Sequence, residues 1–234
     1  MSRAASGERP RRERVREQQR QQPIEEIRQA AFALLDADGV TAVSLAAVGK
    51  AVGMTPQALR RHFPSRDALV DALVIAACAD LGVAVAAAAA PTPQGGTIPK
   101  GARVALLARE YRRWALAHPR RYVMLFTDRS PDVRDPAAGA AAVNQGMLAL
   151  IAALAAIAAP ARASTLDRAL LRWGQAIGAP ADTPPAVLGP AVQLWSRVHG
   201  LVTLEIAGAF DSMGLDAGLL LDVEVGTALD ALGA

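Results

Sequence analysis

The stretch SLAAVGKAVGMTPQALRRHFPSRDAL, residues 44–69, decides the fold of this chain of 234 residues. Ser44 is a preferred residue at the start of a helix, and Thr55 followed by Pro56 makes a second helix start. Gly53 lies between them, and glycine can adopt the positive φ that lets a chain reverse within a few residues. The stretch therefore predicts two short helices, at 44–52 and 55–62, joined by a tight turn.

Two helices joined in this way form a helix-turn-helix, which places its second helix in the major groove of DNA. The helices are expected to be held together by Leu45, Val48, Val52 and Leu59. Glutamine can hydrogen-bond adenine, arginine can bind guanine through two acceptors, and residues at helix starts can contact phosphate. The predicted DNA-contacting residues are Thr41, Ser44, Thr55, Pro56, Gln57, Arg60, Arg61, His62 and Arg66.

The distribution of charge agrees with this interpretation. Residues 1–70 carry a net charge of +4, whereas residues 71–234 carry −1. A basic region is typical of proteins that bind nucleic acid. However, short amphipathic helices with arginine on the solvent side also occur in helical bundles that bind no DNA, so the spacing alone leaves both interpretations open.

The segment 30–69 is similar to the DNA-binding domain of TetR-family transcriptional regulators. The similarity is carried by AAFALL at 30–35, Gly39, SLAAV at 44–48, VGMTPQAL at 52–59 and RHFPSRDAL at 61–69. Where this chain has Arg60 the family commonly has tyrosine, which puts the operator preference in doubt. The resemblance implies a three-helix DNA-binding domain, a linking fourth helix, and a helical C-terminal domain that binds an effector and forms a homodimer.

The rest of the chain has helical periodicity interrupted by proline and glycine, and no window alternates long enough to predict a sheet. We predict an all-α protein of about nine or ten helices. Residues 1–22 are too polar to bury much surface and are expected to form a flexible basic arm. The first helix is expected to begin at Pro23. Residues 23–70 are the predicted DNA-binding domain, and residues 71–234 are the predicted effector-binding and dimerisation domain.

The sequence lacks the usual patterns of enzymes. The three histidines, His62, His118 and His199, have no metal-ligand spacing with one another or with the single cysteine, Cys78. No nucleophile elbow, phosphate-binding loop or dinucleotide fingerprint occurs. We predict no catalytic residue, no metal and no cofactor. The alternatives are a DNA-binding architectural protein that responds to no ligand, and a helical enzyme or binding module with no role on DNA.

The N-terminus has no apolar run that would predict a secretory signal. The most apolar stretches, 81–90 and 147–159, are shorter than the roughly 20 residues that a membrane-spanning helix needs. We therefore expect a cytoplasmic protein without a membrane segment.

The predicted effector site is in the alanine-rich C-terminal domain, where few large side chains decide how space is filled. The predicted ligand-lining residues are Tyr111, Trp114, Tyr122, Phe126, Met147, Trp173, Trp195 and His199. Asn144, Gln145 and Gln175 could orient a largely apolar effector. The same side chains could instead be ordinary core. His199 and Glu205 are six residues apart and are not expected to pair, and the run 195–201 resembles a Trp…His-Gly motif of one TetR subgroup.

Two apolar surfaces are candidates for the dimer interface. The first consists of Val192, Leu194, Val198, Leu201 and Val202, and the second of Leu215, Leu219, Val223 and Leu229. Pairing with their symmetry mates would give an isologous interface and would present two DNA readers to a near-palindromic operator. The alternative is that these residues close the core of a single protomer.

Overall fold

The computed structural model describes residues 8–88, 99–127, 137–157 and 164–232, and every regular element in these ranges is a helix. The predicted all-α class is confirmed. The elements are α1 (Glu8–Asp38), the 3-10 helix η1 (Val40–Ala42), α2 (Leu45–Ala51), α3 (Pro56–Leu59), α4 (Arg66–Ala88), α5 (Lys100–Ala117), α6 (Pro119–Phe126), α7 (Ala137–Ala155), α8 (Asp167–Ile177), α9 (Pro185–Ile206), α10 (Ala209–Met213) and α11 (Ala217–Asp230).

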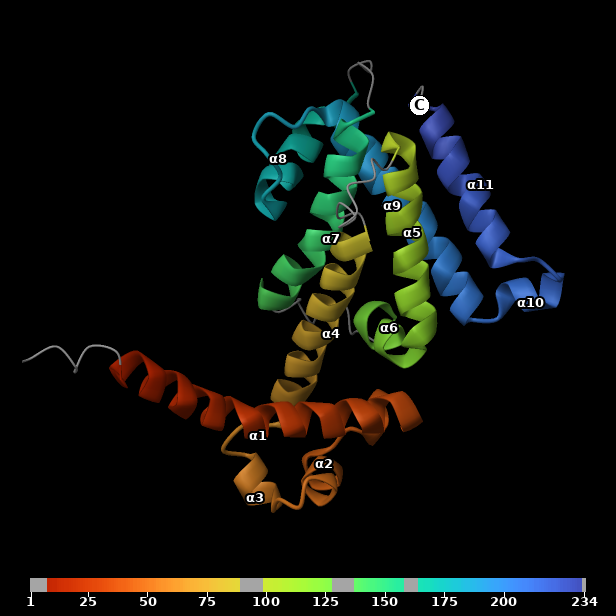
Figure 1. The fold of residues 1–234 in the computed structure, drawn as a ribbon. Helices are drawn as coiled ribbons and strands as arrows, with labels where there is room; N and C mark the ends of the chain where they lie inside the picture. Colours follow the sequence, from red (N-terminus) through yellow and green to blue (C-terminus); the bar gives the residue numbers. More distant parts are fainter. Residues whose placement is uncertain (1–7, 89–98, 128–136, 158–163, 233–234) are drawn as a thin grey trace, which may run out of the picture.

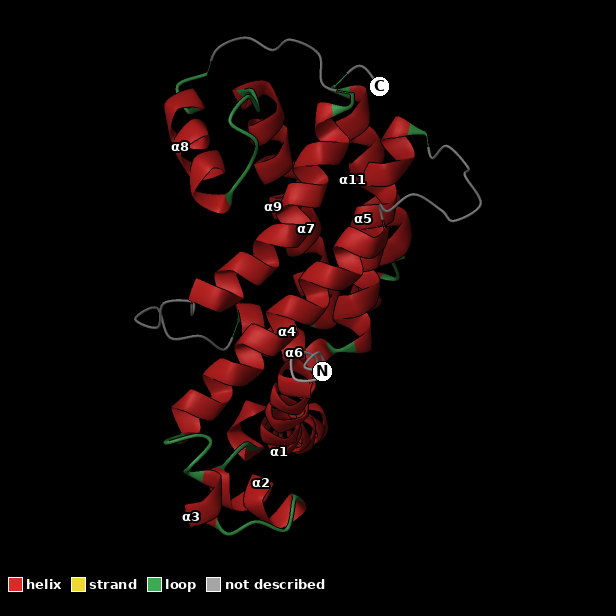
Figure 2. Ribbon diagram, turned by 60° about the vertical axis from the view of Figure 1, so that its left-hand side comes forward, coloured by secondary structure: helices red, strands yellow, loops and turns green. Residues whose placement is uncertain are grey.

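The molecule has a small N-terminal unit beneath a larger helical bundle. α1 lies across the base of the bundle, α2 and α3 lie beneath α1, and α4 rises from this unit into the bundle (Figure 1). The turned view likewise places α2 and α3 at the far end of the molecule from α8 (Figure 2). The helix-turn-helix is therefore presented at one end, away from most of the C-terminal helices.

The first helix is longer than the sequence predicted. It begins at Glu8, and Pro23 lies inside it, so the predicted start at Pro23 is wrong. Arginine, glutamine and glutamate are good helix formers, which favours helix through a segment with no apolar periodicity. Residues 1–7 of the predicted arm lie outside the described residues. Further along, Ile27, Ala31 and Leu35 recur every four residues and are fully buried.

α4 is the strut that links the two parts. With 23 residues it is long and apolar enough to cross a membrane by length and composition, although the run 81–90 alone predicted no span. In the described part of the chain it packs against α7 and α5, and more lightly against α1 and α6. Leu69, Leu73 and Leu81 are buried in these contacts. Its apolar surface is therefore matched by neighbouring helices.

α4, α5, α7 and α9 enclose the core of the bundle, with α8 on one side and α11 on the other (Figure 1). α9 ends at Ile206, and the short α10 follows it. Gly208 has φ 76° and Gly214 has φ 66°, so a left-handed residue ends each segment. These two glycines turn the chain so that α11 returns along the bundle.

Candidate DNA-reading surface and effector cavity

The helix starts of the helix-turn-helix have the predicted caps. The Ser44 hydroxyl accepts a hydrogen bond from the backbone N–H of Ala47 at 3.1 Å, and Thr55 Oγ1 accepts from Ala58 at 3.1 Å. Gly53 has φ 68°, the positive value predicted for the turn. These three features fix where the two helices begin and how the chain reverses between them.

Gly49 is a determinant of the turn that sequence reasoning missed. The backbone N–H of Met54 donates to the Gly49 carbonyl at 2.8 Å, which brings the chain after the turn back onto α2. A Cβ added at Gly49 would lie 2.7 Å from the Met54 carbonyl oxygen, closer than real side chains approach backbone. The only signal in the sequence was a glycine inside a predicted helix, which gives no partner for the close approach.

The second helix is shorter than predicted. α3 ends at Leu59, and the chain continues as a tighter turn in which Arg61 and His62 donate to carbonyls three residues back. Leu59 and Phe63, the buried residues at either end of this turn, are anchored in the core. Gln57, Arg60 and Arg61 are exposed, and His62 is half-buried. The polar side chains predicted to read bases therefore belong to α3 and to the turn after it.

The other residues predicted to contact DNA differ in exposure and in the bonds they make within the domain. Thr41, Thr55 and Pro56 are exposed, whereas Ser44 is half-buried beneath its capping bond. Arg66 is engaged inside the domain: Nε donates to the Val43 carbonyl at 2.9 Å, and a terminal nitrogen donates to the Val40 carbonyl at 2.7 Å. Arg66 therefore holds the start of α4 against η1, and its phosphate contact stays a prediction.

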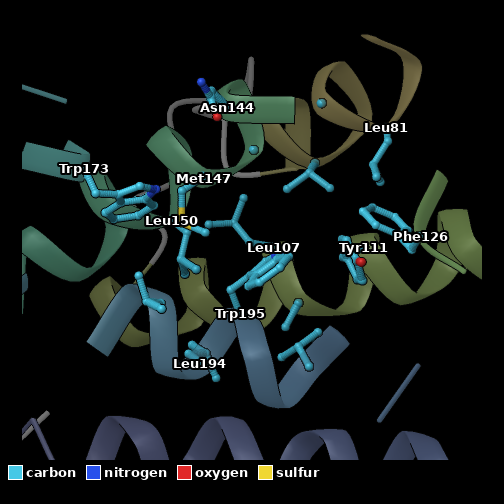
Figure 3. Close-up of a pocket in the computed structure, with 16 residues that line it drawn as sticks. Leu81, Leu107, Tyr111, Phe126, Asn144, Met147, Leu150, Trp173, Leu194 and Trp195 are labelled. Atoms are coloured by element: carbon cyan, nitrogen blue, oxygen red, sulfur yellow. The ribbon is translucent and has the colours of Figure 1, made fainter. Parts of the chain in front are cut away.

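A cavity of about 280 Å³ lies in the bundle between α4, α5, α7, α8 and α9 (Figure 3). Five of the eight predicted ligand residues line it: Tyr111, Phe126, Met147, Trp173 and Trp195. Asn144, one of the predicted polar groups, also lines the cavity, but Gln145 and Gln175 do not and are exposed. The cavity lining also includes Leu81, Leu107, Leu150, Leu194 and Val198. The sequence could not assign these residues, because apolar residues of the core and of a cavity wall follow the same periodicity.

The other three predicted ligand residues do not line this cavity. Trp114 is buried and its indole N–H donates to Asp80 at 2.8 Å, so it joins α5 to α4. Tyr122 is 1 % exposed and lies behind the cavity wall, where its hydroxyl is 2.8 Å from Thr203 Oγ1. His199 also lies behind the wall, stacked on Trp195 with ring centroids 5.2 Å apart. Sequence shows that a side chain is large, but not which side of it meets empty space.

His199 is the centre of a polar cluster. Its Nδ1 is 2.8 Å from the Tyr111 hydroxyl and 3.0 Å from the Tyr122 hydroxyl. The Thr203 hydroxyl donates to the His199 carbonyl at 2.8 Å, so Thr203 Oγ1 accepts from Tyr122. Burial lowers the pKa of His199 and raises the pKa of both tyrosines, well above the usual value for Tyr111. The cluster is therefore uncharged at neutral pH, with Tyr111 as its link to the cavity.

Glu205 is bound to Arg112, a partner that the sequence did not indicate, and the spacing had predicted only that it would not pair with His199. Arg112 Nε donates to one carboxylate oxygen at 2.7 Å and a terminal nitrogen donates to the other at 2.5 Å. This bidentate bond raises the pKa of Arg112 and ties α5 to α9. Among the described residues no group of three or more His, Cys, Asp or Glu could hold a metal ion.

α6 connects the cavity to the N-terminal unit. At its C-terminal end Phe126 lines the cavity. Near its N-terminal end Arg121 donates to both carboxylate oxygens of Asp36 in α1, with contacts of 3.1 Å from Nε and 2.6 Å from a terminal nitrogen. The Arg121 guanidinium also lies 4.2 Å from the ring centroid of Phe32 in α1. One short helix thus contacts both the cavity and α1, the helix against which α2 packs.

The two candidate dimer surfaces have different environments in the protomer. The first surface belongs mostly to the core of the protomer, where Leu194, Val198, Leu201 and Val202 are buried. These residues of α9 face the cavity and neighbouring helices, which agrees with the alternative that they close the core of a single protomer. The α11 surface remains open at Leu215, Leu219 and Val223, which are 48 %, 65 % and 63 % exposed. Leu229 packs against Gly101 of α5 within the same protomer.

A capped helix-turn-helix at one end and a ligand-sized cavity at the other define a class of protein, the helical DNA-binding regulators. Two family models match the chain: bacterial regulatory proteins of the tetR family over residues 27–73, and the tetracyclin repressor-like C-terminal domain over residues 104–228. The second covers more than half of the chain. The chain belongs to the TetR family and is a DNA-binding transcriptional regulator.

Relatives and solved structures agree with this assignment. The crystal structure of regulatory protein SCO4313 is 32 % identical, with a TM-score of 0.75, covering 92 % of this chain and 98 % of that one. The HTH-type transcriptional regulator Rv1816 of Mycobacterium tuberculosis is 28 % identical over 201 residues, 82 % of this chain and 83 % of the relative. The TetR-family regulator PfmR of Thermus thermophilus is 16 % identical with a TM-score of 0.52, covers 87 % of this chain and 97 % of that one, and shows the fold alone.

Proposed function

We propose that this regulator is a cytoplasmic, non-enzymatic repressor that binds a near-palindromic operator as a homodimer and is released by a small-molecule effector. The observation that carries the proposal is the combination, in one protomer, of exposed Gln57, Arg60 and Arg61 at a capped turn with an apolar cavity in the bundle. A ligand that binds one arrangement of the dimer more tightly shifts the population by that difference in affinity.

Arg61 is proposed to contact a base and Arg60 to bind phosphate or a base. Both side chains are exposed at the surface of the protomer. The operator is first selected from a random pool of DNA and then titrated by fluorescence anisotropy. Arg61→Ala is expected to weaken binding by about 1–3 kcal/mol, and Arg61→Lys is also expected to weaken it if the contact has two hydrogen bonds, because lysine keeps the charge but cannot make both bonds. Operator affinity equal to wild type in both variants would contradict the role of Arg61.

The matched control is Arg168→Ala in α8, which removes an exposed arginine far from the turn. Affinity for the operator is also expected to fall steeply as salt rises, because arginine–phosphate contacts release counterions. A flat response between low and moderate ionic strength would contradict DNA binding through the basic N-terminal unit.

The dimer is proposed to form through the open face of α11. Leu219 and Val223 are one turn apart and largely exposed, and an apolar patch of this kind is typical of an interface. Leu219→Glu is expected to shift the mass measured by light scattering towards that of a monomer, whereas Leu166→Glu, at an exposed leucine beside α8, leaves the mass unchanged. An unchanged mass in Leu219→Glu would place the interface elsewhere.

Effector occupancy is proposed to reach the DNA reader through α6. The proposal is supported by the bonds of Arg121 to Asp36 and its contact with Phe32, because the same helix carries Phe126 into the cavity wall. A ligand that displaces Phe126 would move Arg121 and with it α1. The orientation of the helix-turn-helix would then depend on whether the cavity is filled.

A further inference from the structure

We propose that the cavity binds an uncharged, planar aromatic compound and excludes both carboxylates and ammonium groups. The inference rests on the proposed function only in taking this cavity as the effector site. The chemical class of the ligand is inferred from three properties of the residues that line the cavity.

The first property is the absence of charge. None of the sixteen lining residues, all within the described chain, is Asp, Glu, Lys, Arg or His. Two arginines of α5, the helix that carries Leu107 and Tyr111, are already bonded, Arg109 to Asp222 at 3.0 Å and Arg112 to Glu205. A buried ionised group without a partner is strongly disfavoured relative to water. A charged ligand would therefore lose its hydration here and gain no counter-charge, and for an ammonium group the ring faces replace only part of the lost hydration.

The second property is the concentration of aromatic rings. Four of the nine aromatic residues of the chain line this cavity: Tyr111, Phe126, Trp173 and Trp195. Trp173 lies at one end, Tyr111 and Phe126 lie at the other, and Trp195 lies between them (Figure 3). Rings in such positions can pack in offset or edge-to-face geometry against another ring. A flat aromatic ligand can pair with several of these rings in such geometry, whereas a saturated ring of the same size has no π-system and gains only ordinary packing.

The third property is the small polar capacity of the walls. The Tyr111 hydroxyl is bonded to His199 at 2.8 Å, and the other polar groups on lining side chains are the Asn144 amide and the indole N–H groups of Trp173 and Trp195. The volume of about 280 Å³ is near the lower limit of ligand pockets, which are about 300–1,000 Å³. The ligand is therefore a small compound with one or two neutral hydrogen-bonding groups.

The test uses four probes that share a skeleton: 2-acetylnaphthalene, its saturated decalin analogue, 2-naphthoate and 2-naphthylmethylammonium. Binding to the full chain without DNA is measured at pH 7 by calorimetry and by quenching of tryptophan fluorescence, since two of the three tryptophans line the cavity. We expect 2-acetylnaphthalene to bind more than about tenfold more tightly than either ion. Binding of an ion as tight as that of the ketone, no binding of the ketone, or equal binding of the decalin would overturn the proposal.

A single substitution should reverse the preference. Met147 lines the cavity, and lysine has a similar length, so Met147→Lys places a cation in the wall. We expect this variant to bind 2-naphthoate at least about tenfold more tightly than wild type does. Val83→Lys, at a residue of α4 that is 58 % exposed and outside the lining, is the matched control and is expected to leave all affinities unchanged. An equal gain in both variants would overturn the proposal. Circular dichroism shows whether Met147→Lys is folded. If it is not folded, the affinities of the four probes for the wild-type protein decide.

Release of operator DNA is measured separately by anisotropy with the same probes. Tight binding of the ketone without release would contradict the effector response and leave the ligand class standing. Release by 2-naphthoate but not by the ketone would overturn the ligand class and leave the effector response standing.

Discussion

The DNA-reading unit and the effector bundle are held together in different ways. In the reader, the decisive contacts join residues only a few positions apart: the caps of Ser44 and Thr55, and the bond from Met54 to Gly49. In the bundle, the decisive contacts join α5, α6 and α9 across 77 or more residues of chain, as between Tyr122 and His199. The reader thus depends on backbone geometry, whereas the bundle depends on which side chains meet after folding.

The largest effect is expected from Gly49→Ala in the reader. The new methyl group would lie 2.7 Å from the Met54 carbonyl, so the turn must open, at a cost of about 1–3 kcal/mol. We expect loss of operator binding in anisotropy and early exchange of the α2 and α3 amides. Gly200→Ala, where nothing lies within 4 Å of the new Cβ, is the control. Equal loss in both variants would show that the local packing at Gly49 is not decisive.

A smaller effect is expected from Tyr122→Phe in the bundle. The change removes a buried hydroxyl bonded to Thr203 and His199, but Thr203 keeps its bond to the His199 carbonyl and His199 keeps Tyr111. The free energy of unfolding is expected to fall by about 1 kcal/mol in urea titrations. Operator affinity per folded protein should hardly change. A larger loss of DNA binding than of stability would mean that the two regions are less separate than their contacts indicate.

The His199 cluster also predicts a dependence on pH. Burial lowers the pKa of folded His199 below 6.5, so the unfolded chain binds a proton more readily than the folded chain does. Neutral His199 therefore makes its full contribution to the free energy of unfolding above about pH 6.5. This contribution is lost as pH falls through the folded-state pKa of His199. Unfolding free energies measured at pH 7.5 and 5.5 should differ more in wild type than in His199→Gln. The same difference in both proteins would assign the dependence to other groups.

The smallest effect on stability is expected where the two regions meet. The Arg121–Asp36 pair is partly exposed, with side chains 18 % and 38 % exposed, so Arg121→Gln should cost no more than about 1 kcal/mol. Its effect should appear instead in the ratio of operator affinities with and without a bound ligand. Arg113→Gln, which breaks an exposed pair within α5, is the control. An unchanged ratio in Arg121→Gln would contradict the proposed route through α6.

The sequence by itself determined the helical class, the position of the turn and the caps that begin α2 and α3. It could do so because capping and positive φ are properties of residues next to one another in the chain. The same local reasoning failed at Pro23, where good helix formers extend α1 without any apolar periodicity. It also failed at the end of α3, where the helix gives way to a turn with hydrogen bonds between residues three apart.

Tertiary structure alone decided which large side chains enclose the cavity. Trp114, Tyr122 and Trp195 are similar in sequence terms, yet Trp114 is bonded to Asp80, Tyr122 lies behind the wall and Trp195 lines the cavity. It also separated the buried stripe of α9 from the open face of α11, although both read as apolar helices. Periodicity reports that a face is apolar, but the partner of that face comes from helices far away in the chain, and only folding brings them together.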